Sequence, residues 1–157
     1  MPIEDSPLLH AFTDVVRAKT ISDLGRVATS RVRALIGADG CTLVLREGGF
    51  CHYADEDAIS PLWKGRRFPM SACISGWVMR ERDYAVIEDI RGDMRIPQDL
   101  YLSTFVRSMA MVPIDEQPVG ALGAYWSSRH QATALELECL RTLADAVSLA
   151  LSMQPQE

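Results

Sequence analysis

The sequence predicts an α+β fold in which helices at both ends of the chain cover one face of a central antiparallel sheet of five to six strands. Apolar residues recur at helical spacing near both ends, whereas the middle contains short strand patterns separated by turn residues. Hairpin signals at Gly48-Gly49 and at residues 115–118 join strands that follow one another in sequence. With 157 residues and no visible linker, we expect a single domain over residues 1–157.

The first part of the chain is expected to form two helices. Apolar side chains have helical spacing between Leu8 and Val16, and again between Leu24 and Ile36. Thr20 or Ser22 would cap the second helix at its start. Gly37 would end it, because glycine readily adopts the left-handed conformation found there.

Strands and short helices are expected to alternate through the middle of the chain. Residues 55–64 are interpreted as a short helix or loop, residues 73–82 as a short helix, and residues 99–104 as one helical turn in the long connection 91–104. Alternation places Met109 and Met111 on one face of their strand and Ala110 and Val112 on the other. The predicted strands cover residues 41–46, 50–53, 67–70, 84–90, 108–114 and 119–127.

The clearest element is a helix over residues 133–153, whose acidic residues come early, as the helix dipole favours. Two interpretations of its apolar stripe stay open. The helix packs on its own sheet, or one of its faces pairs with a second subunit in a homodimer. The residues of the proposed dimer helix are Leu140, Leu143, Val147 and Leu151.

Composition excludes several classes of protein. The chain is 48% hydrophobic and 24% charged, which is typical of a globular domain and not of a disordered chain. A net charge of −5 argues against nucleic acid or an anionic membrane as the main partner. No membrane-spanning stretch or signal peptide is visible, so we expect a cytoplasmic protein.

The second face of the sheet is expected to lie under the connections 55–65 and 91–104. Long irregular connections are uncommon unless they are functional, and a sheet covered by loops favours a small-molecule pocket. Because Glu88 and Asp89 are neighbours on a strand, only one can face that pocket; alternatively, Asp89 holds Arg91 or Arg95 in place. The candidate ligand-binding residues are Trp63, Met70, Cys73, Trp77, Asp89, Tyr101, Phe105, Met109 and Tyr125.

Several segments, taken together and in this order, resemble a GAF domain, a small sensory module of signalling proteins. With the flanking helices, the resemblance covers about residues 8–152. Residues 51–65 further resemble the GAF modules that precede bacterial sensor histidine kinases. The matching segments are Ile74-Ser-Gly-Trp77, Val86-Ile-Glu-Asp-Ile90, Asp93-Met-Arg95, Phe105–Ile114 and Pro118–Trp126.

The resemblance implies a regulatory input domain, not an enzyme. Such a domain would bind an unidentified small molecule or sense a redox signal, and control an attached or partner signalling enzyme of a two-component system. A histidine kinase is the expected output domain, and a homodimer through the terminal helices is the expected assembly. The alternatives are a ligand-free dimerisation scaffold and a free methionine sulfoxide reductase.

The cysteines and histidines do not indicate a particular cofactor. No Cys/His spacing predicts a metal site, and no arrangement predicts catalytic residues. Residues 91–107 lack the cysteine that a GAF-type reductase or a bilin-binding GAF domain would place there, and His52 is an isolated candidate haem ligand. The cofactor is therefore unknown, with bilin and haem disfavoured. Cys51 and Cys73 are either oxidation sensors or inert buried thiols.

Overall fold

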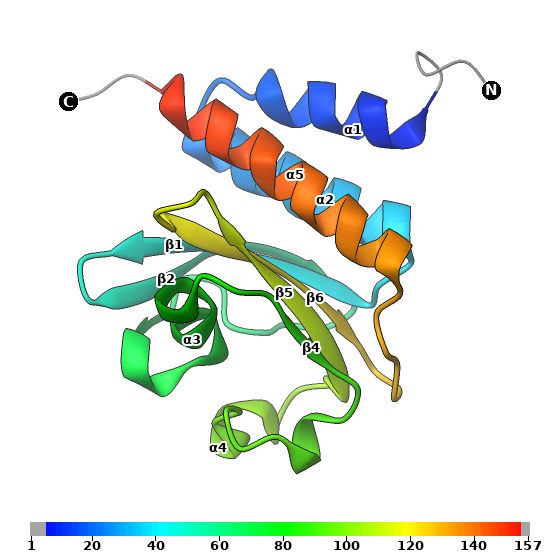
Figure 1. Cartoon of the computed structure of the whole chain (residues 1–157), viewed down its shortest axis with the longest axis vertical. Helices are drawn as coiled ribbons and strands as arrows, with labels where there is room; N and C mark the ends of the chain where they lie inside the picture. Colours follow the sequence, from blue (N-terminus) through cyan, green and yellow to red (C-terminus); the bar gives the residue numbers. More distant parts are fainter. Residues whose placement is uncertain (1–5, 155–157) are drawn as a thin grey trace.

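The computed structural model describes residues 6–154 and shows a six-stranded antiparallel sheet with both faces covered (Figure 1). The strand order is β3-β2-β1-β6-β5-β4, so the predicted α+β architecture is confirmed. The strands are β1 (Gly40–Glu47), β2 (Phe50–Ala58), β3 (Arg67–Pro69), β4 (Ala85–Ile87), β5 (Ser108–Ile114) and β6 (Gly120–Trp126).

Three helices cover one face: α1 (Pro7–Val16), α2 (Ile21–Ile36) and α5 (Ala134–Ser152). The helices α2 and α5 lie on the sheet, and α1 lies on these two helices on the side away from the sheet (Figure 1). The opposite face carries α3 (Ile74–Glu81), α4 (Gln98–Tyr101) and two 3₁₀ turns, Met70–Ala72 and Ile90–Gly92.

Side-chain caps fix where the covering helices begin and end. Thr20 Oγ1 accepts a hydrogen bond from the backbone N–H of Asp23 at 3.0 Å, and Gly37, at φ 65°, ends α2 as expected. At the start of α5, Thr133 and Glu136 form a capping box.

The two largest differences from the sequence prediction concern β2 and β4. Residues 55–58, expected in a short helix or loop, belong to β2, because residues 40–43 of β1 pair with residues 55–58 across a bulge between Leu43 and Val44. In contrast, β4 is shorter than predicted, because the chain turns into a 3₁₀ helix at Ile90.

The three central strands, β1, β5 and β6, are buried on both faces. The predicted alternation is confirmed: Met109 and Met111 contribute to the core beneath α3 and α4, whereas Ala110 and Val112 contribute to the core beneath the long helices. Each central strand therefore takes part in two separate hydrophobic cores.

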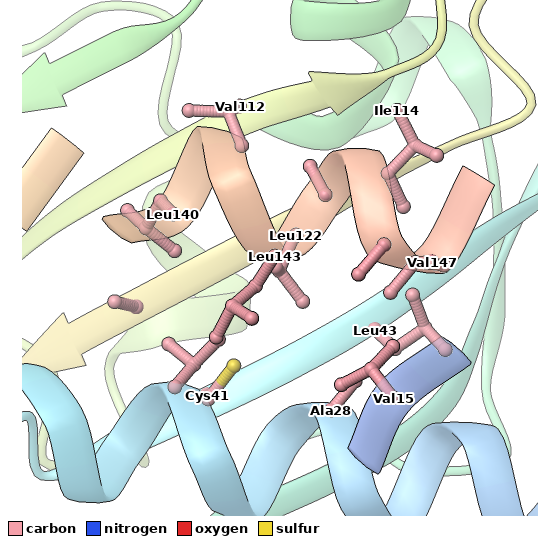
Figure 2. Close-up of a cluster of buried hydrophobic side chains, with 14 of the residues drawn as sticks. Val15, Ala28, Cys41, Leu43, Val112, Ile114, Leu122, Leu140, Leu143 and Val147 are labelled. Carbon is pink, nitrogen blue, oxygen red and sulfur yellow. The ribbon is translucent and has the colours of Figure 1, made fainter. Parts of the chain in front are cut away.

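The predicted dimer stripe of α5 lies largely inside the domain. Leu140, Leu143 and Val147 are fully buried and point toward the sheet and the neighbouring helices (Figure 2). They are therefore core residues, and the interpretation that places them at a subunit interface is wrong. Leu151 is partly buried against the same core. The homodimer itself stays a prediction, and exposed apolar residues such as Leu149 on α5 and Met153 at its C-cap would have to supply its surface.

No helix among residues 6–154 is long and apolar enough to span a membrane.

Replacing Leu143 by alanine should lower the free energy of unfolding by about 2–5 kcal/mol, because it leaves a cavity in the core beneath the helices. Urea unfolding followed by circular dichroism measures the change. The matched control is Leu135→Ala on the same helix, where the side chain is 69% exposed and the expected change is within about 0.5 kcal/mol. Equal effects of the two substitutions would contradict the assignment of Leu143 to the core.

Candidate functional site

The sheet face beneath α3 and α4 carries a cluster of aromatic and sulfur-containing side chains, which we call the aromatic–sulfur cluster. Most of the predicted ligand-binding residues lie in it, and Trp77 and Phe105 pack against its edge. Its aromatic and sulfur-containing members are Cys51, Tyr53, Trp63, Phe68, Met70, Cys73, Met79, Tyr101, Met109, Met111 and Tyr125.

Trp63 lies at the centre of this cluster. Its ring makes edge-to-face contacts with Tyr53, Tyr101 and Tyr125, at centroid distances of 5.5, 4.7 and 5.6 Å. Its indole Nε1 donates a hydrogen bond of 3.2 Å to the carbonyl oxygen of Leu100 in α4. Trp63 thus connects the segment between β2 and β3 to the cover over the sheet.

Two hydrogen-bonded pairs join hydroxyl groups that are buried in this apolar interior. Thr42 Oγ1 and the Tyr125 hydroxyl are 2.9 Å apart, and the Tyr53 hydroxyl and Ser75 Oγ are 3.0 Å apart. Burial raises the pKa of the Tyr53 and Tyr125 hydroxyls, so both remain protonated at neutral pH.

The connection 88–107, which includes α4, forms a roof over the cluster. Gln98 Nε2 donates to the carbonyl oxygen of Ile90 at 2.8 Å, and the Tyr101 hydroxyl contacts Met109 Sδ at 3.9 Å. The roof is thus held by a small number of polar contacts and by the burial of residues such as Ile96 and Tyr101.

Asp89 lies outside the aromatic–sulfur cluster, at the start of the roof. Its carboxylate accepts two hydrogen bonds from the Arg107 guanidinium, at 2.9 and 3.0 Å, and one from the backbone N–H of Arg91 at 3.1 Å. The hydrogen bonds from Arg107 and then from Arg91 lower the pKa of Asp89 to about 2. Asp89 therefore joins the two ends of the roof and does not point into the cluster.

A second charged contact ties the roof to α3. The Arg95 guanidinium lies 4.4 Å from the centroid of the Trp77 ring in a cation–π geometry. Arg95 also donates to both carboxylate oxygens of Asp93, at 3.0 and 2.7 Å. A movement of α3 would therefore act directly on the roof segment around Arg95.

The cluster side chains fill most of the space that the sequence assigned to a pocket. A cavity of about 90 Å³ lies within the roof, where its lining includes Tyr101, Leu102, Thr104 and Val106. Ligand pockets usually measure about 300–1,000 Å³, so a ligand would need the roof to move.

The start of α3 packs closely against the 3₁₀ turn that precedes it. A Cβ atom on Gly76 would overlap the backbone carbonyl of Met70, so this position requires glycine. Directly before α3, Cys73 is the N-cap residue; its Sγ lies 3.6 Å from the carbonyl oxygen of Pro69 and accepts a hydrogen bond from Ser75 Oγ at 3.3 Å.

Sequence reasoning did not include Tyr53, Ser75 and Thr42 among the site residues. Strand alternation could have found Tyr53, because it lies two residues after Cys51 and shares its face. The role of Ser75 depends on the packing of α3 against β2, and no local pattern indicates it.

Within residues 6–154, no group of three or more His, Cys, Asp or Glu side chains could hold a metal ion.

Residues 18–152 match the family model of the GAF domain. No curated protein matches the sequence. Among solved structures, the GAF domain of an Acinetobacter phosphoenolpyruvate-protein phosphotransferase superposes with a TM-score of 0.83 at 14% identity, over 97% of this chain and 94% of that one. The corresponding domain from Coxiella burnetii gives 0.82 at 16% identity, over 93% and 90% of the two chains.

A free methionine-R-sulfoxide reductase from Neisseria meningitidis, solved in complex with its substrate, gives a TM-score of 0.73 at 19% identity, over 92% of this chain and 88% of that one. At such identities the structural similarities show the fold alone.

Replacing Asp89 by asparagine should make the protein less stable near neutral pH and should matter less in acid. The pKa of Asp89 is lowered on folding, so its ion pair stabilises the protein fully above its ordinary value of about 3.9 and loses this effect as pH falls towards about 2. Urea unfolding of both proteins between about pH 6 and about pH 3 measures this. A difference in unfolding free energy that stays constant over this range would contradict the ion-pair assignment.

Replacing Gly76 by alanine should destabilise the domain by about 1–3 kcal/mol or more, because the added methyl group overlaps a backbone carbonyl that cannot simply rotate away. Thermal unfolding is the measurement. Gly49→Ala is the matched control, since a Cβ at Gly49 meets no atom within 4 Å. Similar melting temperatures for the two variants would show that the start of α3 is not closely packed.

Proposed function

The chain belongs to the GAF domain family, and from this premise we propose that it is a sensory domain that receives a small-molecule or redox signal and controls a signalling enzyme. The observation that carries the proposal is the aromatic–sulfur cluster under the roof 88–107. Apolar, sulfur-rich interiors adapt to different occupants, because methionine side chains are flexible and polarisable.

The ligand would enter by displacing the roof. Tyr101 is central to this step, since it lines the small cavity and its ring contacts that of Trp63. If α4 moved outward, the hydrogen bond from Trp63 Nε1 to Leu100 would break, and space beside Trp63 would open.

The signal would cross the sheet through the central strands. On β6, Tyr125 packs in the aromatic–sulfur cluster, and its neighbours Ala124 and Trp126 pack under the helices. Close-packed interiors transmit small shifts, so a change beside Tyr125 is felt on the other face. The output would be read from the position of α5, which packs against the sheet, α1 and α2.

A two-component sensor histidine kinase is the output enzyme that we propose. The support is the resemblance of residues 51–65 to GAF modules that precede such kinases. In this view the chain itself is not an enzyme, and its partner is an attached or separate kinase in a homodimeric assembly.

The alternative function is a ligand-free scaffold for dimerisation. The observation that favours it is that the cluster residues fill their own face of the sheet. The two functions differ in what occupies the cluster when the protein is isolated from cells.

Native mass spectrometry of the freshly purified chain, with an absorbance scan of the same sample, tests the proposal. We expect a retained small molecule, detected as mass in excess of the polypeptide. Tyr101→Trp, which adds volume where the ligand would lie, should reduce the retained fraction at least about tenfold, equivalent to about 1.4 kcal/mol. Leu135→Trp is the matched control, because Leu135 is 69% exposed and lies on α5, on the other face of the sheet.

If the spectrum shows only the bare polypeptide mass, hydrogen exchange of residues 98–104 is measured with and without a small-molecule extract of the source cells. A bare mass together with unchanged exchange would overturn the ligand part of the proposal. That pair of results would support the scaffold. Subunit count comes from the same spectrum and tests the homodimer independently.

A further inference from the structure

Two cysteines from separate elements meet at the start of α3. Cys51 lies on β2, where it pairs with Phe68 of β3, and it is fully buried. After β3, the 3₁₀ turn Met70–Ala72 brings the chain back, so that Cys73 packs in the same buried cluster as Cys51, close enough for the two side chains to interact. Cys51 Sγ also lies 3.4 Å from Met70 Sδ.

The surroundings of the two thiols are unequal. The hydrogen bond from Cys51 lowers the pKa of Cys73, as do the hydrogen bonds from Ser75 Oγ and the backbone N–H of Gly76, while Arg80 adds a favourable positive charge. The same pairing, together with burial, raises the pKa of Cys51. Cys73 thus has the environment of a nucleophilic thiolate. Cys51 has the environment of a resolving thiol, which attacks the nucleophile after its oxidation.

We propose that Cys51 and Cys73 are a redox site that forms a reversible intramolecular disulfide on reaction with a small hydroperoxide such as hydrogen peroxide. This inference specifies the redox signal of the proposed function. It rests on that function only for the claim that the disulfide controls an output enzyme. The disulfide itself can form whether or not an output enzyme is present.

The reaction balances in two steps. Cys73 thiolate attacks one oxygen of the peroxide, the O–O bond breaks, and Cys73 becomes a sulfenic acid while hydroxide leaves and is protonated to water. Cys51 sulfur then attacks the Cys73 sulfur, the S–O bond breaks, and the leaving oxygen takes the Cys51 proton to form a second water. The two thiols supply two electrons to the peroxide, and a cellular dithiol reverses the change.

Exposure selects the oxidant. Cys73 is 6% exposed and Cys51 is 0% exposed, so a small peroxide reaches Cys73 more readily than a bulky disulfide such as oxidised glutathione. The other thiols do not compete: burial raises the pKa of both Cys41, in the core under the helices, and Cys139, on α5.

Disulfide formation would move the start of α3. The two sulfur atoms must approach each other to about 2.05 Å, and Cys73 must turn away from Ser75 Oγ and the carbonyl oxygen of Pro69. Because Cys73 is the N-cap of α3, this shift reaches Trp77 within the helix and, through the cation–π contact, Arg95 in the roof. The oxidation state of the pair would thus set how firmly the roof is held.

The test is disulfide mapping of the full chain. The reduced protein is treated with hydrogen peroxide, alkylated under denaturing conditions, digested and analysed by mass spectrometry. We expect the peptides that contain Cys51 and Cys73 to be joined after oxidation and separated again by a dithiol reductant, with a change in Trp fluorescence that follows the same time course. If both thiols remain free in the folded, peroxide-treated protein, the inference is overturned.

Variants separate this site from the other thiols. Cys139→Ala removes the most accessible other thiol and should leave the disulfide unchanged. Cys73→Ser, which keeps a good N-cap residue, should abolish both the disulfide and the fluorescence change. In Cys51→Ala, Cys73 should proceed to sulfinic acid, because no second thiol is available.

A disulfide that forms normally while the retained ligand of the previous section is absent would uphold this inference and remove the ligand part of the proposed function. If both thiols stay free while a small molecule is retained, this inference is overturned and the ligand part of the proposed function is upheld.

Discussion

The two-sided burial of β1, β5 and β6 is the constraint on which the rest of this structure depends. Antiparallel strands alternate their side chains between faces, so a strand buried on both sides must supply two cores at once. On β5, Met109 and Met111 supply the aromatic–sulfur cluster, while Ala110 and Val112 supply the core under the helices. Neither core can be repacked without moving a strand that the other core shares, and this gives the domain a physical route from its roofed face to its terminal helices.

The two covers of the sheet differ in the way that a sensor requires. The helical cover is continuous and capped, with Leu140, Leu143 and Val147 buried in it. The other cover is a connection with one short helix, held by the Asp89–Arg107 ion pair, the Trp63–Leu100 hydrogen bond and the Arg95–Trp77 contact. Regions with few stabilising contacts open at low free-energy cost, and ligand-binding segments come from that group.

Both proposed inputs act on the same part of the molecule. A ligand would displace α4, which carries Tyr101. Oxidation of Cys73 would shift α3, which carries Trp77. Each would loosen or reposition the roof, and each would be felt by Tyr125 and the central strands. The close packing of Gly76 on Met70 leaves little freedom at the start of α3, so a change at Cys73 must be passed on to its neighbours.

The sequence by itself determined the fold class, most of the elements and the face on which Met109 and Met111 lie, because hydrophobic periodicity and caps act over a few residues. It failed where pairing between distant segments decided the outcome. Residues 55–58 became strand because β1 offered partners, and the apolar stripe of α5 was turned inward because α1, α2 and the sheet enclose it. Only the tertiary structure placed Asp89 on Arg107, Tyr53 on Ser75 and Cys51 beside Cys73, since these contacts join residues 18 to 22 positions apart, beyond the reach of any local pattern.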